Sequence, residues 1–146
     1  MSAVTADTIR RSVDVPLSPE RAFALFTERA STWWPLATHS VAGEAADTVV
    51  FEPQIGGRVY ERTRDGAEHD WGETTAWDPP RGFALAWTVD PACADTVVEV
   101  SFTATEGGTH VQLEHRGWRG AKRETIEGYA GGWEVVLGTF ASSADN

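Results

Sequence analysis

The middle of this 146-residue chain is a succession of short strand-like segments, and a single long helical stripe follows them. Turn signals such as Asp65-Gly66 and Gly107-Gly108 separate the segments. The strands expected there are 48–52, 58–64, 68–77, 83–89, 95–105 and 109–118. Connections this short favour an antiparallel meander over βαβ units.

The last segment, residues 122–140, has the spacing of an amphipathic helix. Its large apolar side chains recur at intervals of three and four residues: Ile126, Tyr129, Trp133, Val136, Leu137 and Phe140. Four glycines interrupt it, each costing up to about 1 kcal/mol relative to alanine: Gly128, Gly131, Gly132 and Gly138. That cost is tolerable where tertiary packing holds the helix and something approaches its backbone closely. Residues 142–146 read as a frayed tail.

One strand and a helical stretch precede the meander. Alternation over residues 9–15 predicts a half-buried strand. Ser18 is a suitable N-cap and Pro19 suits the first helical position, and helical character continues, with a break, until Pro35. The order strand, two short helices, six strands and long helix predicts an α+β fold. We expect one domain over residues 1–146, with its core at about 8–141.

The expected sheet has one face to bury, and only the C-terminal helix is long enough to cover it. A sheet that curls around such a helix leaves a gap, which becomes a cavity when its walls are bulky and rigid. The chain supplies such walls, with seven Trp, six Phe and two Tyr. Because indoles pack with gaps and their buried N–H groups need partners, we interpret the aromatic set as a cavity wall.

The charge balance excludes two classes of partner. Twelve Lys and Arg stand against twenty-two Asp and Glu, a formal net charge of −10. No basic excess is present to displace counterions from nucleic acid or to dock on an anionic membrane. The first residues lack the features of a secretory signal, and no apolar run approaches the roughly 18 residues of a membrane span, so we expect a cytoplasmic protein.

Reactive side chains give little sign of covalent or metal chemistry. The single cysteine, Cys93, has acidic neighbours that disfavour a thiolate nucleophile. The histidines lack the short ligand spacing of a metal site: His39, His69, His110 and His115. We therefore expect no catalytic nucleophile, no metal and no other cofactor.

His115 is expected on the same strand face as Val111 and Leu113. It is then either a core histidine hydrogen bonded to the backbone or a polar group at the cavity wall that orients a ligand. If it is buried, desolvation favours its neutral form.

Two carboxylates are candidates for acid–base work. Alternation turns Glu61 inward, opposite a solvated arginine face, and places Glu73 on one face with Trp71. An inward carboxylate pair suits a cyclase- or hydratase-like reaction. The alternatives are that one strand register differs from this expectation or that an arginine pairs with the carboxylates.

Several motifs follow one another from about Ile9 to Phe140. They are Ser18-Pro19-Glu20-Arg21-Ala22-Phe23, Trp33-Trp34-Pro35, Glu52-Pro53-Gln54-Ile55-Gly56-Gly57-Arg58, Gly72-Glu73, Trp77-Asp78-Pro79-Pro80, Phe83-Ala84-Leu85-Ala86-Trp87, Gly108-Thr109-His110-Val111-Gln112-Leu113-Glu114-His115 and Gly132-Trp133. In order and spacing they resemble START-like (SRPBCC) domains, and more narrowly the branch related to the C-terminal domain of the activator of heat-shock protein 90 ATPase. The resemblance implies a helix-grip fold, in which a curved seven-stranded antiparallel sheet wraps around the C-terminal helix over an apolar cavity.

The leading expectation is that the cavity binds a small hydrophobic molecule, a lipid or a polyketide-like aromatic. The candidate ligand-binding residues are Trp33, Trp34, Glu61, Trp71, Glu73, Trp87, Phe102, His115, Tyr129 and Trp133. Because no nucleophile–base set stands out, the balance is against an enzyme.

Two alternatives stay open, because the resemblance implies no single activity. One is a co-chaperone that activates heat-shock protein 90 ATPase, although characterised activators use an additional N-terminal domain for which 146 residues leave no room. The other is a cyclase or hydrolase that uses the same pocket. The protein is expected to be a monomer, or a homodimer where exposed Trp side chains form an interface.

Overall fold

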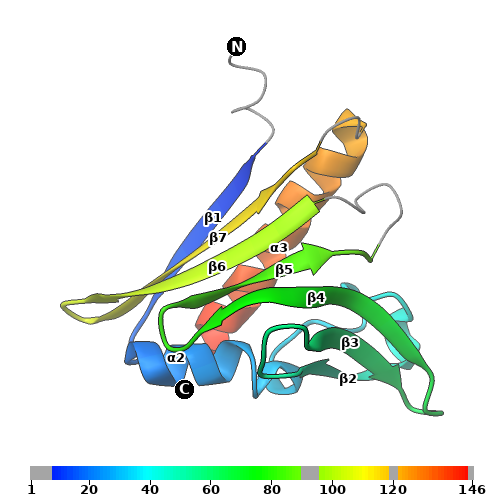
Figure 1. Ribbon diagram of the computed structural model, residues 1–146, viewed down its shortest axis with the longest axis horizontal. Coiled ribbons are helices and arrows are strands. Elements are labelled where there is room, and N and C mark those ends of the chain that lie inside the picture. The colour runs from blue at the N-terminus through cyan, green and yellow to red at the C-terminus, as the bar shows by residue number, and fades with distance from the viewer. Residues whose placement is uncertain (1–7, 90–95, 119–121, 145–146) are drawn as a thin grey trace.

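Seven strands form one antiparallel sheet that curls around a long C-terminal helix (Figure 1). The computed structural model describes residues 8–89, 96–118 and 122–144. Its elements are β1 (Ile9–Val15), α2 (Pro19–Phe26), the 3-10 turns η1 (Ala30–Thr32) and η2 (Gly43–Ala45), β2 (Ala46–Phe51), β3 (Arg58–Thr63), β4 (Glu68–Asp78), β5 (Gly82–Trp87), β6 (Thr96–Thr105), β7 (Gly108–Arg116) and α3 (Arg123–Ala144). The predicted α+β class and the seven-stranded sheet are confirmed.

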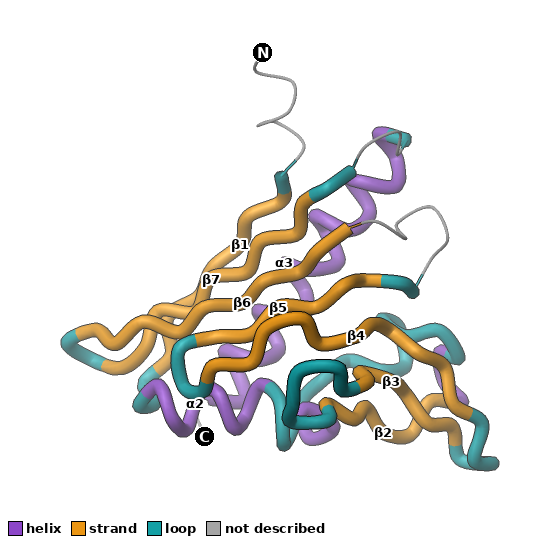
Figure 2. Tube along the Cα trace, in the orientation of Figure 1, coloured by secondary structure: helices purple, strands orange, loops and turns teal. Residues whose placement is uncertain are grey.

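The sheet is a meander with the first strand added at its far edge. The strand order is β1-β7-β6-β5-β4-β3-β2, and β1 closes onto β7 with Val13 opposite Val111. Figure 2 shows α3 running along the concave side of the sheet, with α2 across one end. In the described part of the chain, no helix is long and apolar enough to cross a membrane.

The helices lie in the regions where the sequence predicts them, but their lengths and ends differ from the prediction. Ser18 caps α2 by accepting a hydrogen bond from the Arg21 backbone N–H (3.3 Å), as predicted. The second predicted helix is only the 3-10 turn η1. The prediction of a frayed tail is wrong for residues 142–144, because α3 continues there and buries Ala144 four residues beyond Phe140. Cys93 and the rest of residues 90–95 and 119–121 lie outside the described residues.

Two β-bulges bend β4. The pairing with β3 shifts between Val59 and Tyr60, which leaves Trp71 as the extra residue, and the pairing with β5 shifts between Thr74 and Ala76. A bulge bends its strand and increases its twist. The bulges therefore contribute to the curl that wraps the sheet around α3.

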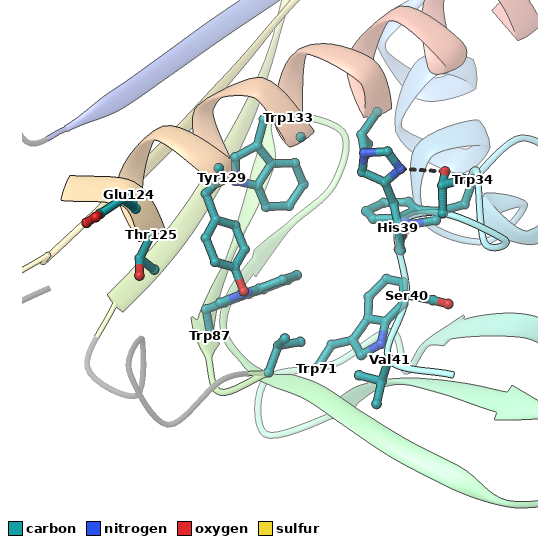
Figure 3. Close-up of a pocket in the computed structure, with 15 residues that line it drawn as sticks. Trp34, His39, Ser40, Val41, Trp71, Trp87, Glu124, Thr125, Tyr129 and Trp133 are labelled. Atoms are coloured by element: carbon teal, nitrogen blue, oxygen red, sulfur yellow. Dashed lines mark hydrogen bonds between the residues drawn. The ribbon is translucent and has the colours of Figure 1, made fainter. Parts of the chain in front are cut away.

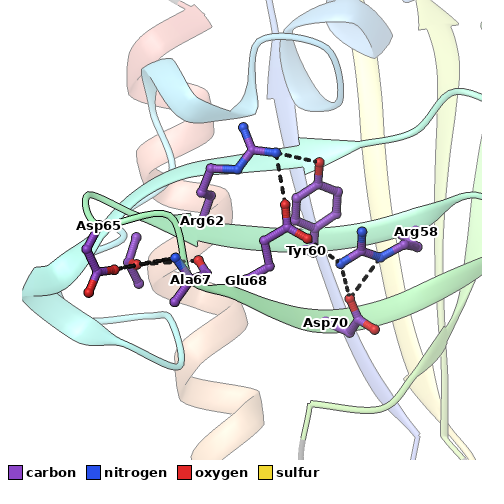
Figure 4. Close-up of polar contacts among 8 residues, drawn as sticks. Arg58, Tyr60, Arg62, Asp65, Ala67, Glu68 and Asp70 are labelled. Atoms are coloured by element: carbon purple, nitrogen blue, oxygen red, sulfur yellow. Dashed lines mark hydrogen bonds and ion pairs between the residues drawn. The ribbon is translucent and has the colours of Figure 1, made fainter.

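The outer face of β3 and β4 carries an ion-pair network (Figure 4). Arg58 contacts Asp70 (2.6 Å) and Glu68 (3.1 Å), and Arg62 contacts Glu68 (3.0 Å). The Arg58 guanidinium also stacks over the Tyr60 ring, 4.0 Å from its centroid. Hydrogen bonds from Arg62 and Arg58 lower the pKa of the Glu68 carboxyl. The arginine face of β3 points outward, as predicted, which directs Glu61 to the concave side.

Candidate ligand-binding pocket

A pocket of about 430 Å³ opens between α3, the sheet and the loop that precedes η2 (Figure 3). It is lined by Trp34, Thr38, His39, Ser40, Val41, Trp71, Trp87, Val89, Glu124, Thr125, Gly128, Tyr129, Gly132, Trp133 and Val136. Its volume falls within the roughly 300–1,000 Å³ typical of small-molecule sites. Five of the ten candidates meet here: Trp34, Trp71, Trp87, Tyr129 and Trp133.

One face of α3 forms a whole wall of the pocket. Its lining residues recur at helical spacing, and two of them, Gly128 and Gly132, have no side chain to fill the space. A Cβ atom at Gly128 would meet no atom within 4 Å, and one at Gly132 would lie 3.6 Å from Cδ2 of His39. The glycines thus create room, and at Gly132 a side chain does approach the helix backbone.

The four indoles that line the pocket are each anchored through their ring nitrogen. The Trp34 N–H donates to the His39 carbonyl oxygen (2.9 Å), and the Trp71 N–H donates to Glu61 Oε1 (2.6 Å). The Trp87 N–H donates to the Tyr129 hydroxyl (3.2 Å), and the Trp133 N–H donates to His115 Nδ1 (3.0 Å). Every indole N–H is used inside the protein, so these walls offer a ligand ring surface and no N–H donor.

Glu61 is fully buried and ties two pocket walls together. Its carboxylate accepts hydrogen bonds from the Trp71 indole and from the backbone N–H groups of Val41 (2.7 Å) and Ala42 (2.8 Å). Three N–H donors compensate the desolvation of this charge. Glu61 therefore holds the loop before η2 against the sheet, and its predicted inward orientation is confirmed.

His115 is also fully buried and lies behind Trp133. Its Nδ1 accepts the Trp133 N–H, so the ring proton is on Nε2 and is donated to Thr96 Oγ1 (2.9 Å). Burial lowers the pKa of His115 to about 3. His115 is therefore a neutral core histidine that orients Trp133 in the pocket wall. Its ring forms hydrogen bonds with two side chains and not with the backbone, the partner expected for a core histidine.

The remaining three candidates are not part of the pocket lining. Trp33 donates its indole N–H to the Leu25 carbonyl (2.8 Å), and its ring packs on Phe26 in the core. Phe102 is buried against the same Phe26 ring. Glu73 is exposed, so the expected inward pair with Glu61 does not form. The bulge at Trp71 breaks the alternation that placed Trp71 and Glu73 on one face.

Sequence reasoning missed the loop wall and part of the helix wall. The loop residues are Thr38, His39, Ser40 and Val41, and the helix residues include Glu124, Thr125, Gly128 and Gly132. The loop has no periodic pattern that could have predicted its position. The helix residues did carry a signal, since Gly128 and Gly132 are four apart and share a face with Tyr129 and Trp133.

A second hollow, of about 830 Å³, lies between α2 and β2 and includes Phe23, Phe51 and Trp77 in its lining. None of the ten candidate residues lines it. Among the described residues, no group of three or more His, Cys, Asp or Glu side chains is arranged to hold a metal ion. The pocket against α3 is therefore the candidate site.

A curled antiparallel sheet that grips a C-terminal helix over an aromatic pocket defines the helix-grip, START-like class of protein. Within that class, the sequence profile described as "Activator of Hsp90 ATPase homolog 1-like protein" matches residues 16–144. The chain belongs to this family. A search of curated proteins finds no match.

Solved structures confirm the fold, and one of them has a higher sequence identity to this chain. Protein MLL2253 from Mesorhizobium loti is 23% identical, with a TM-score of 0.70 over 94% of this chain and 96% of that one. The Aha1 dimer from Colwellia psychrerythraea is 15% identical, with a TM-score of 0.72 over 94% and 95%. Txn09, described as an anthrahydroquino-γ-pyrone synthase complexed with SUM, is 35% identical, with a TM-score of 0.56 over 77% of each chain.

Proposed function

We propose that the pocket against α3 binds a small, flat hydrophobic molecule of the polyketide-like aromatic class. The observation that carries this proposal is the wall of four indoles and the Tyr129 ring around one pocket. Aromatic walls favour stacked and edge-to-face contacts with another ring system. Each indole is held by a hydrogen bond, which lowers the entropic cost of ordering the walls around a ligand.

Two further observations support an aromatic ligand over a fatty acid. Glu124 lies at the pocket and the chain carries a net charge of −10, so a carboxylate headgroup is disfavoured there. The 35% identical relative is named for a fused aromatic product that contains a γ-pyrone ring. Uncharged planar rings therefore suit this pocket better than long anionic chains.

A thermal-shift panel tests the ligand class with alizarin, flavone, cholesterol and palmitate. A ligand at a hundredfold excess over its Kd stabilises the native state by about 2.7 kcal/mol, which raises the melting temperature of a domain this size by roughly 5–10 °C. We expect alizarin and flavone to raise it and palmitate to leave it unchanged. A response to palmitate alone would reassign the pocket to lipids, and a flat response to all four compounds would contradict the proposal.

A second candidate is a ring-forming enzyme that uses the same pocket, favoured by the identity to a synthase. Glu61 and His115 contribute no free acid or base to it, since both are buried and hydrogen bonded to the protein. Incubation with aromatic polyketide precursors, followed by mass spectrometry, tests this candidate. Recovery of every precursor unchanged would exclude it for those substrates.

A third candidate follows from the family description, which names the ATPase of heat-shock protein 90. The test is stimulation of that ATPase by the purified protein. Stimulation that a pocket ligand does not alter would assign the chaperone interaction to another surface, and an absence of stimulation would remove this candidate.

A further inference from the structure

The pocket leaves the polar groups of a ligand few partners. The four lining indoles donate their N–H groups within the protein. Two lining hydroxyls are also engaged within their own loop. Ser40 donates to the Leu36 carbonyl (2.6 Å) and accepts from the Gly43 N–H (2.9 Å), and Thr38 Oγ1 lies 2.7 Å from His39 Nδ1. A polar group on the ligand must therefore meet another atom of the lining.

His39 has a ring nitrogen available for that contact. Its Nδ1 bonds to Thr38, and its backbone carbonyl accepts the Trp34 indole N–H. The ring edge lies against α3, with Cδ2 at 3.6 Å and Nε2 at 3.9 Å from the position of a Cβ on Gly132. Figure 3 shows the second ring nitrogen of His39 on the side toward α3, opposite the nitrogen that takes part in the dashed hydrogen bond. Within the described part of the chain, Nε2 has no hydrogen bond of its own.

The absence of a side chain at Gly132 leaves space beside the imidazole ring. An alanine there would reach ordinary van der Waals contact with His39, and any larger side chain would occupy the space that the ring fills. The loop thus presents one imidazole at the pocket, held by a hydrogen bond, a main-chain anchor and a helix backbone. Such a fixed group can select among ligands at low entropic cost.

We propose that His39 is a specificity-determining residue, whose Nε2 hydrogen bonds to a hydroxyl group on the rim of a planar aromatic ligand. A phenolic hydroxyl both donates and accepts, so it suits either tautomer of the imidazole. This inference rests on the proposed function, because it names the polar group of the ligand that the aromatic walls bind.

The experiment compares alizarin with anthraquinone, which has the same rings and no hydroxyl, by quenching of tryptophan fluorescence. His39→Phe keeps a flat ring without a nitrogen, and His39→Gln restores a hydrogen-bonding group. One lost hydrogen bond corresponds to about three- to tenfold weaker binding. We expect His39→Phe to bind alizarin more weakly by that factor, to bind anthraquinone unchanged, and His39→Gln to recover much of the preference.

The outcomes separate the two proposals. If His39→Phe binds alizarin as tightly as the wild type, the role of His39 is wrong and aromatic binding stands. If His39→Phe weakens both compounds equally, the residue shapes the pocket without reading the hydroxyl, which also overturns the inference. If the wild type binds neither compound, the proposed function fails and the inference fails with it. Melting temperatures of the unliganded variants control for folding.

Discussion

Glu61 and His115 are buried polar side chains that hold indoles of the pocket wall. Alternation along their strands placed both on the inner face, because successive side chains in a regular strand point to opposite faces of the sheet. Their partners could not be predicted in the same way. Glu61 accepts hydrogen bonds from the backbone of Val41 and Ala42 in an irregular loop. His115 accepts one from Trp133 of α3. Both sets of partners therefore depend on tertiary packing.

The pKa of His115 makes stability depend on pH. Burial lowers it from 6.5 to about 3, so below pH 6.5 the unfolded chain binds a proton that the folded chain does not. The contribution of neutral His115 to the free energy of unfolding is therefore complete above pH 6.5. It is lost as the pH falls toward 3, at up to about 1.4 kcal/mol per pH unit.

His115→Gln isolates this effect. Glutamine can still accept from Trp133 and donate to Thr96, but it cannot be protonated. We expect the free energy of unfolding of the variant to fall less steeply between pH 6.5 and 3, measured by urea unfolding at several pH values. Parallel curves for the two proteins would contradict the assigned neutral state of His115.

At the scale of elements, α3 and β4 differ in how far the sequence could predict them. The apolar stripe of α3 correctly predicted a long helix with Trp133 and Phe140 on its buried face. The alternation of side chains along β4 is interrupted at Trp71, where a bulge adds one residue. The amino-acid composition around Trp71 did not indicate this bulge. Uninterrupted alternation assigned Glu73 to the inner face, whereas the structure shows it exposed.

The glycines of α3 and β4 should respond in opposite directions to alanine. A Cβ at Gly131 or Gly138 would meet no atom within 4 Å, so each substitution should raise the free energy of unfolding by about 0.5–1 kcal/mol through helix propensity. A Cβ at Gly72 would clash with the Ala86 carbonyl oxygen, so Gly72→Ala should destabilise the fold. Chemical denaturation measures all three, and a neutral Gly72→Ala would show that this strand pair has room to shift.

At the scale of the whole molecule, the sequence predicted the curled sheet, the gripping helix and a cavity between them. It placed the cavity wall less well, since the loop wall has no periodicity and five of the ten candidates lie outside the lining. The helix α3 has two roles in the molecule. It is the main cover of the concave face of the sheet, and at Gly128 and Gly132 it forms an open wall of the pocket.

A pair of glycine variants on α3 tests the pocket as the ligand site. Gly128 and Gly131 are both exposed helical glycines with open space around a Cβ, but only Gly128 lines the pocket. Leucine at either position brings a similar gain in helix propensity. Only Gly128→Leu fills the cavity, so Gly131→Leu is its matched control.

The most direct measurement is a calorimetric titration of alizarin into the wild type, Gly128→Leu and Gly131→Leu. Aromatic binding in the pocket predicts at least about tenfold weaker binding to Gly128→Leu, the equivalent of roughly 1.4 kcal/mol, and no change in Gly131→Leu. Equal affinities for all three proteins would contradict ligand binding in this pocket, because a leucine side chain at Gly128 would occupy part of the space that the ligand needs.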